Sequence, residues 1–382
     1  MTSTFGIAMP LMSMPVLFDE ISEELGLSVV QVGTVWGMFP LGGILLALIG
    51  GMLCDRFGTR LTLGISCLLS GLFGAARGLS GDFITLAATM LLFGFPAGVL
   101  PLVMPKAIGT WFQGRNLSIA LSIASISMAL GFTLGTLLSA TVFSPLLGGW
   151  RNVIFSYGGI SIVLGFLWFL TRANPGTVEA SANNLSTISF RQATSHVFRI
   201  RAVWLLAIIL LGHASCVQGM LGYLPLYLRK IGWIAASADG AAASFHVASI
   251  IATIPIALLS NKLASRKVVI YATLIMTTIG VALLSVVSGS MIWLLVIIAG
   301  IFRDGFMAIF MTTLVETEGV GATYAGTAMG LILTFVRLGE FVSPPIGNSL
   351  ANISLSSPFL LWGFLAVIAL VASYFLKETA RG

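Results

Sequence analysis

The chain has 382 residues, of which 57% are hydrophobic and only 8% are charged, with 19 Lys and Arg against 13 Asp and Glu. Soluble domains carry about 25% charged residues, so this composition excludes an ordinary soluble protein. The charges lie one or two at a time between apolar stretches, which also excludes the nucleic-acid-binding protein that a net charge of +6 would otherwise suggest.

Twelve apolar runs follow one another along the chain, each near or above the roughly 20 residues that a helix needs to cross a bilayer. They are rich in small residues, which let membrane helices approach closely, and they lack the period-2 alternation of β-barrel strands. The runs lie at residues 2–18, 29–53, 61–79, 83–108, 116–141, 152–171, 203–227, 238–260, 268–288, 291–314, 322–346 and 357–376. They predict an all-α integral membrane protein with twelve transmembrane helices. The first run is short and no basic residue precedes it, which leaves open a start upstream of Met1.

The longest polar stretch, residues 172–201, separates the sixth and seventh runs. Its Asn, Ser, Thr, Pro and Gly residues are typical of a linker or a short surface helix, and we expect it in the cytoplasm. It divides the chain into an N-terminal six-helix bundle (1–171) and a C-terminal one (202–382). Residues 51–60 recur in degenerate form at 257–266. Parallel repeats of six spans are a transporter architecture.

Basic residues are distributed unevenly over the connections between runs. With the N-terminus in the cytoplasm, most Lys and Arg residues of the connections fall on the cytoplasmic side, as the positive-inside rule requires. The opposite side receives the acidic cluster Asp19, Glu20, Glu23 and Glu24. We therefore expect a multi-pass protein of the cell (plasma or inner) membrane with both termini in the cytoplasm.

The connection between runs two and three carries a motif, Gly51-Met-Leu-Cys-Asp55-Arg56-Phe-Gly58-Thr-Arg60. It resembles the Gly-x-Leu-Ala-Asp-Arg-x-Gly-x-Arg loop of the major facilitator superfamily. The resemblance implies two pseudo-symmetric six-helix bundles, transport by alternating access, and a loop that latches the cytoplasmic side. The implied gating residues are Gly51, Asp55, Arg56, Gly58 and Arg60. The alternative is an ordinary turn with positive-inside arginines.

The chain departs from the pattern of that family in two places. The fourth run, around Gly94, lacks the Arg that usually precedes its glycines. The fifth run, around Gly131 and Gly135, lacks the Gly-Pro pair of antiporters. Together with the absence of a carboxylate at mid-depth in runs one to six, these departures count against a drug/proton antiporter, which remains the alternative.

Four charged residues lie near the middle of runs ten and eleven, where each charge costs about 2.5–3.5 kcal/mol on insertion scales. Arg303 and Asp304 are neighbours in run ten, and the i,i+3 spacing of Arg337 and Glu340 places both on one face of run eleven. Two interpretations stay open. The pairs Arg303–Glu340 and Asp304–Arg337 neutralise each other between helices, or an arginine binds an anionic substrate while Glu340 or Asp304 takes up a proton.

His213 in run seven and His246 in run eight are the other titratable groups at depth. A single buried histidine is more often a hydrogen-bonded packing residue than a proton relay. We keep His246 as a candidate proton-coupling residue beside Glu340 and Asp304.

The sequence thus predicts a secondary transporter of a small solute, an organic or inorganic anion, coupled to protons. Arg303 and Arg337 are the predicted substrate-binding residues. There is no Walker sequence for ATP, and the three cysteines and three histidines show no metal-ligand spacing. We therefore expect no cofactor, no bound metal and no enzymatic activity. The expected partners are the substrate, protons and the lipid bilayer, with the protein as a monomer, and a non-transporting sensor is a remote alternative.

Overall fold

The protein is described here by a computed structural model of residues 2, 4–171, 190–263 and 265–376. These residues are helical apart from short connections, and they include no β-strand. The chain divides into two compact units. Unit 1 comprises Met1–Leu27 and Met38–Ile188, and unit 2 comprises Ser28–Gly37 and Ser189–Gly382. Of the expected linker 172–201, residues 172–189 lie outside the described residues, as do both ends of the chain.

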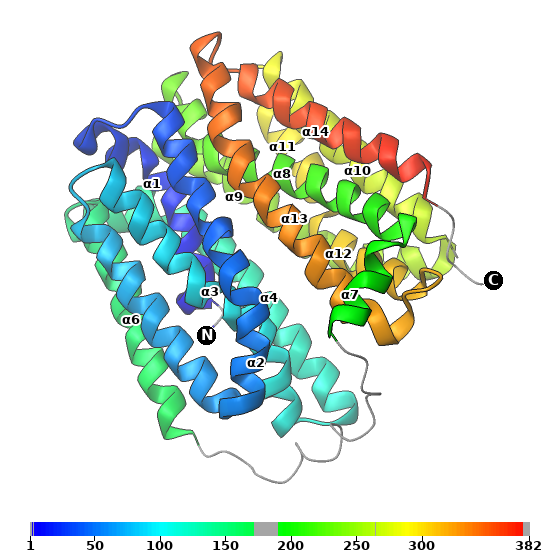
Figure 1. The fold of residues 1–382 in the computed structure, drawn as a ribbon. Helices are drawn as coiled ribbons and strands as arrows, with labels where there is room; N and C mark the ends of the chain where they lie inside the picture. The colour runs from blue at the N-terminus through cyan, green and yellow to red at the C-terminus, as the bar shows by residue number, and fades with distance from the viewer. Residues whose placement is uncertain (1, 3, 172–189, 264, 377–382) are drawn as a thin grey trace. The chain divides into compact units, whose positions relative to one another are not determined.

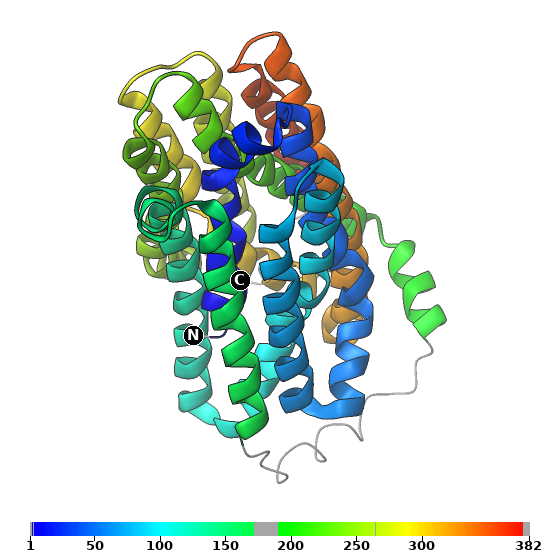
Figure 2. The same ribbon diagram turned by 90° about the vertical axis from the view of Figure 1, so that its left-hand side faces the viewer.

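Unit 1 consists of long helices that run beside one another in both ribbon views (Figures 1 and 2). In chain order they are η1 (Thr4–Ala8), α1 (Met9–Leu25), most of α2 (Val29–Ala76), η2 (Arg77–Leu79), α3 (Phe83–Trp111), α4 (Gly114–Leu138), η3 (Ser139–Phe143), α5 (Ser144–Leu147) and α6 (Trp150–Leu170). A Cβ at Gly42 of α2 or at Gly94 of α3 would clash with a carbonyl oxygen of the other helix. Small residues therefore set the close approach of these two helices.

Unit 2 is organised around α8. In chain order its helices are the first turns of α2, α7 (Phe190–Phe198), α8 (Arg201–Lys230), α9 (Ala235–Leu263), α10 (Arg266–Ala282), η5 (Leu283–Ser285), α11 (Met291–Gly300), α12 (Arg303–Glu316), α13 (Gly321–Ser349), η6 (Leu350–Asn352) and α14 (Ser357–Tyr374). α8 packs against α9, α13 and α14. The buried Trp362 of α14 fills the space beside Gly219 of α8 and Gly347 of α13. Trp36, at the start of α2, donates a hydrogen bond of 2.8 Å to the carbonyl of Gln218.

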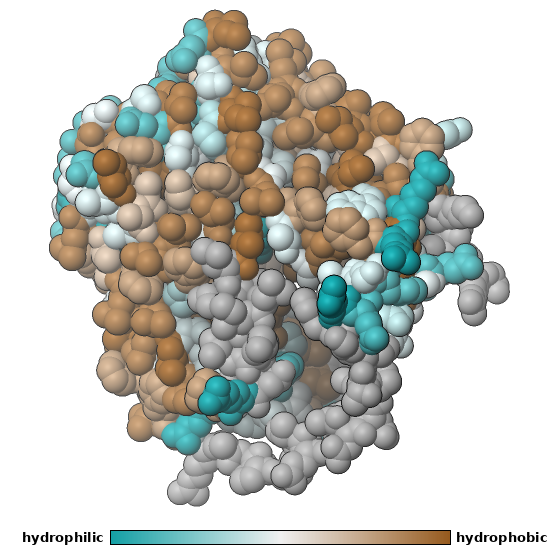
Figure 3. Space-filling view, viewed as in Figure 1, coloured by the Kyte–Doolittle hydropathy of each residue, from teal (hydrophilic) through white to brown (hydrophobic). Residues whose placement is uncertain are grey.

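The predicted all-α membrane fold is confirmed. Within the described residues, nine helices are long and apolar enough to cross a membrane. The remaining three runs, at 2–18, 29–53 and 238–260, also lie on helices, namely α1, the first part of α2 and α9. Hydrophobic side chains cover much of the face shown in Figure 3. Such a surface is suited to lipid rather than to water.

The structure refines the predicted run boundaries in two places. Runs two and three lie on two helices that α2 joins across a kink at Gly58, so the predicted connection is a bend. Run ten is one span, Met291–Glu316, that is divided into two helical elements by a two-residue turn: α11 ends at Gly300, and α12 begins at Arg303 after Ile301 and Phe302. The break lies inside an apolar span, at the position of the predicted charges.

Candidate functional site

Arg303 lies beside two buried histidines in unit 2. It is the first residue of α12, and its charge acts on the imidazoles of His213 in α8 and His246 in α9. His213 is 5% exposed and His246 is 1% exposed. The charge of Arg303 on α12 thus reaches two buried imidazoles on two other helices. The sequence predicts a site role for His246 but not for His213.

The ring of His213 packs on an aromatic neighbour. Its centroid lies 4.5 Å from that of Phe306, one turn into α12. Among the described residues, Nδ1 of His213 has no hydrogen-bond partner. A buried polar atom without a partner is costly, and this one lies next to the charge of Arg303. His213 therefore packs against α12, the helix that begins at Arg303, and becomes a further candidate site residue.

Arg337 and Glu340 form an ion pair along α13. Nη1 of Arg337 donates to Oε2 of Glu340 over 2.9 Å, and the two side chains are 38% and 13% exposed. The pairing is therefore within one helix, as the i,i+3 spacing allows. Among the described residues this is the only hydrogen bond of Arg337, which leaves most of the donors of its guanidinium available.

The pair on α13 lies at the depth of His213. Gly339, between Arg337 and Glu340, faces Leu211 and Ser215 of α8, the residues that bracket His213. Oγ of Ser343 also donates to the carbonyl of Ser215 over 2.8 Å. α13 packs on α8, and α12 packs on both α9 and α13, so the helices that carry Arg303, His246, Arg337 and Glu340 are neighbours in unit 2.

Asp304 belongs to the same stretch but adds no described contact. It is the second residue of α12, directly after Arg303, and its side chain lies outside the described residues. Its predicted pairing with Arg337 stays a prediction. Within the described residues no group of His, Cys, Asp and Glu side chains could hold a metal ion.

The predicted gating motif forms the bend in α2. Gly58 has φ 79° and ψ 163°, a conformation that glycine adopts at little cost and other residues avoid. Oγ1 of Thr62 donates to the carbonyl of Gly58 over 2.8 Å, and the guanidinium of Arg60 donates to the carbonyl of Phe169 at the end of α6. Arg56 is exposed. Gly51 and Asp55 lie on the helical backbone before the bend, with the Asp55 side chain outside the described residues.

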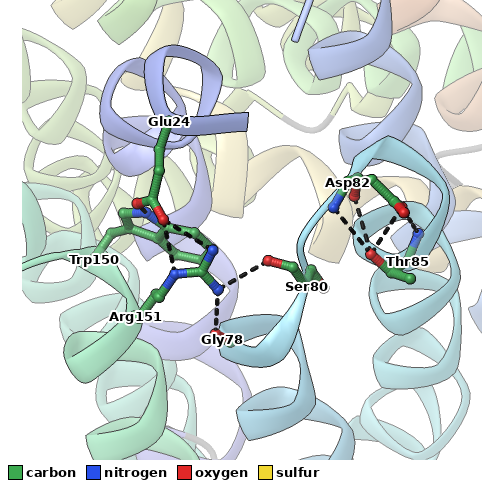
Figure 4. A network of polar contacts seen from close by, with 7 residues as sticks. All are labelled: Glu24, Gly78, Ser80, Asp82, Thr85, Trp150 and Arg151. Carbon is green, nitrogen blue, oxygen red and sulfur yellow. Dashed lines mark hydrogen bonds and ion pairs between the residues drawn. The ribbon is translucent and has the colours of Figure 1, made fainter. Parts of the chain in front are cut away.

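A polar network joins three helix ends of unit 1 (Figure 4). Glu24 accepts a hydrogen bond of 2.5 Å from Nε1 of Trp150 and pairs with Nη2 of Arg151 at 2.9 Å. Nη1 of Arg151 also donates to the carbonyls of Gly78 and Ser80, over 2.6 and 2.8 Å. The hydrogen bond from Trp150 and the charge of Arg151 together lower the pKa of Glu24. This network holds helix ends together and is separate from the candidate site.

Asp82 caps α3 next to that network (Figure 4). Its Oδ1 accepts hydrogen bonds from the backbone N–H and from the hydroxyl of Thr85, over 2.8 and 2.9 Å. These bonds hold the pKa of Asp82 below its usual value. The cap satisfies donors that the first turn of a helix leaves free, which fixes the start of α3 at Phe83.

Two further arginines, near the ends of helices, are buried. Arg77 is fully buried in unit 1, with its guanidinium 4.2 Å from the ring centroid of Phe93 and a hydrogen bond of 3.0 Å to the carbonyl of Pro10. Arg229 pairs with Asp239 in unit 2 at 2.6 Å, with side chains 9% and 0% exposed. Charge patterning alone did not reveal either burial, because both residues lie at helix ends.

Comparisons with known proteins agree on one family. A sequence model described as the Major Facilitator Superfamily matches residues 1–344 and 236–382. Over 92% of this chain and 87% of the relative, the sequence is 24% identical to the 3-(3-hydroxy-phenyl)propionate transporter of Escherichia coli (strain K12). It is also 26% identical to the hexuronate transporter of Bacillus subtilis (strain 168), over 39% of this chain and 35% of that protein.

Solved structures show the same fold. A bacterial homolog of the human lysosomal transporter Spinster, in an inward-facing and unoccupied conformation, superposes with a TM-score of 0.78 at 16% identity, over 98% of this chain and 94% of that one. A point mutant of the nucleoside transporter NupG gives a TM-score of 0.78 at 14% identity, over 98% of this chain and 97% of that one.

Proposed function

Because the chain belongs to the Major Facilitator Superfamily, we propose that it is a secondary transporter that carries a small organic anion, a carboxylate, by proton-coupled alternating access. The observation that carries the proposal is the position of Arg303. It begins a helix at a break inside a membrane span, beside two buried histidines.

The broken span favours an anion for electrostatic reasons. The N-terminus of a helix carries a partial positive charge and unpaired N–H groups. In transporters, half-helix N-termini of this kind face anionic groups of the substrate. Arg303 adds a full positive charge at the start of α12, and its planar fork suits bidentate binding of a carboxylate. The arrangement therefore supports a carboxylate over a neutral sugar or a cation.

The relatives support the same class of substrate. Two of them are the 3-(3-hydroxy-phenyl)propionate and hexuronate transporters described above. A third, the probable L-galactonate transporter of Escherichia coli (strain K12), is 25% identical over 55% of this chain and 48% of that protein. All three compounds carry a carboxylate at neutral pH. An aromatic acid and sugar acids share little else, so the group common to them is the one that Arg303 would bind.

The ion pair on α13 supplies a route to proton coupling. Glu340 pairs with Arg337 at 2.9 Å. A substrate carboxylate that takes over the guanidinium of Arg337 would release Glu340, and a carboxylate without a cationic partner inside a membrane favours its protonated form. Glu340 would then carry a proton with the substrate, with His246 and Asp304 as further candidates in the same region. We also propose a monomer with cytoplasmic termini in the cell membrane, on the basis of the positive-inside rule.

Uptake by the purified protein in liposomes tests the substrate class. We expect uptake of phenylpropionate or glucuronate, and none of their uncharged amides. The variant Arg303→Gln should lose at least tenfold in uptake, because hydrogen bonds to charged groups contribute about 1.5–3 kcal/mol. The control Arg201→Gln removes an exposed charge at the start of α8 and should transport normally. Equal uptake of acids and amides, or of lipophilic cations alone, would overturn the proposal.

A second experiment tests the coupling separately. An inward proton gradient should drive accumulation of the acid, and a protonophore should abolish it. Glu340→Gln should keep exchange of labelled for unlabelled substrate, which needs no net proton movement, and lose accumulation. If this variant still accumulates substrate in response to the gradient, Glu340 is not the coupling residue.

A further inference from the structure

The short helix α7 is anchored to unit 2 by one face. Ala193 and Val197, one turn apart, are buried, while the residues around them are exposed. The ring of His196 stacks on Tyr324 of α13 at a centroid distance of 4.4 Å. Its Nε2 also lies 2.8 Å from the carbonyl oxygen of Gly319. The position of α7 is therefore defined by its contacts rather than by its own nine residues, which are too few for a stable isolated helix.

The outer face of α7 forms a basic recess. Its volume is about 580 Å³, and it is lined by Arg191, Gln192, Ser195, His196 and Arg199. Arg191 and Ser195, four residues apart, lie on one side of the helix, and Arg199, directly after the end of α7, lines the same recess. Hydrophilic side chains gather over α7 in Figure 3.

The chemistry of this recess suits a phosphate group. Among the described residues, neither Arg191 nor Arg199 forms an ion pair, so both guanidinium groups remain available. Ser195 and Gln192 add a hydroxyl and an amide donor. A group with several acceptor oxygens and a negative charge matches such a set. His196 contacts Gly319, and the exposed Glu318 directly precedes that glycine. One carboxylate offsets only part of the charge of the two arginines.

The position of α7 along the chain points to a lipid as the source of the phosphate. α7 ends at Phe198 and the membrane span of α8 begins at Arg201, so the recess lies at the end of a span, at the level of lipid headgroups. Phe198 is 53% exposed, and its ring packs edge-on against Trp204 at 4.7 Å. Tryptophan is enriched at this boundary of the membrane. Basic clusters next to a membrane span attract anionic lipids.

We propose that the recess on α7 binds the phosphate group of an anionic phospholipid. The site is distinct from the Arg303 region, and the proposal does not depend on the transport of an organic acid. It gives the chain between the two halves a fixed attachment to one leaflet of the bilayer.

Native mass spectrometry of the detergent-purified protein, titrated with phosphatidylglycerol or phosphatidylcholine, tests the proposal. The wild type should retain phosphatidylglycerol in preference to phosphatidylcholine. The double variant Arg191→Gln/Arg199→Gln should bind phosphatidylglycerol about 30-fold more weakly, since each interfacial arginine contributes about fivefold. The variant Arg191→Lys/Arg199→Lys should retain most of the binding, which shows that the site depends on charge and that the helix tolerates substitution.

Arg201→Gln is the matched control, because it removes a neighbouring exposed charge that does not line the recess. Equal losses in Arg201→Gln and in the double variant would overturn the proposal in favour of general surface charge. Displacement of phosphatidylglycerol by inorganic phosphate below about 1 mM would overturn the lipid assignment, because headgroup and free ion would then bind equally well.

Discussion

The buried ion pair between Arg229 and Asp239 makes a quantitative prediction about unit 2. The pair joins the end of α8 to the start of α9 at 2.6 Å, and the carboxylate is fully buried. Asp239→Asn keeps the shape of the side chain but removes its charge. Losing one partner of a buried pair costs about 3–5 kcal/mol, because the other charge stays buried.

That cost translates into a large thermal shift. For a folded body of about 150–250 residues, 1 kcal/mol corresponds to roughly 2–4 °C, so Asp239→Asn should lower the melting temperature by roughly 6–20 °C. The assay is thermal unfolding of the detergent-purified protein, followed by tryptophan fluorescence. The matched control is Glu316→Gln, which breaks the ion pair with Arg266 at 3.6 Å, in which both side chains are partly exposed. Exposed pairs contribute about 0–1 kcal/mol, so the control should shift the melting temperature by only a few degrees.

A double variant separates charge from packing. Arg229→Met/Asp239→Leu removes both charges together and should recover most of the loss, because apolar side chains of similar size often replace a buried pair without cost. If Asp239→Asn melts within a few degrees of the wild type, or if the double variant is as unstable as the single one, the reasoning from burial is wrong.

Three other predictions concern single positions. Glu24→Gln should lower the melting temperature at pH 7, and the difference from the wild type should shrink as the pH is lowered through and below the ordinary glutamate pKa. The folded state lowers the pKa of Glu24, so its contribution is complete above the ordinary pKa and is lost as the pH falls through the folded-state value. A difference that is constant with pH would contradict this. Gly58→Ala should lower the free energy of unfolding by about 1–3 kcal/mol, because alanine disfavours φ 79° with ψ 163°. An unchanged melting temperature would contradict this and would show that the bend relaxes. Gly219→Ala should lower the free energy of unfolding by about 1–3 kcal/mol, because the added methyl group overpacks against Trp362. In the double variant Gly219→Ala/Trp362→Phe, the smaller phenylalanine ring should restore part of that loss.

Hydropathy and spacing predicted the features of this protein that depend on neighbouring residues in the sequence. Each apolar run lies on a helix because its own backbone must satisfy its hydrogen bonds in lipid. The pairing of Arg337 with Glu340 follows from the pitch of one helix. The bend at Gly58 coincides with the motif, since only glycine adopts that conformation easily.

Features that depend on packing between helices could not be predicted in this way. The turn at Ile301 and Phe302 directly precedes the charges of Arg303 and Asp304, yet the hydropathy of run ten as a whole is that of one continuous span. Gly300 and Gly305, on either side of Arg303, are the feature of the sequence that could have indicated this turn. The contribution of His213 depends on how α8 meets α12, which no local pattern encodes. The burial of Arg77 likewise depends on Phe93, from another helix.

The burial of Arg77 also constrains how the protein is made. When the span that ends at Leu79 first enters the bilayer, the long side chain near its end can extend to the water. Its final position needs the carbonyl of Pro10 from the first helix and the ring of Phe93 from the helix that follows. The guanidinium therefore cannot leave water until the next helix has been synthesised and inserted. A chain that ends before Phe93 therefore lacks one of the groups that surround this guanidinium in the folded unit.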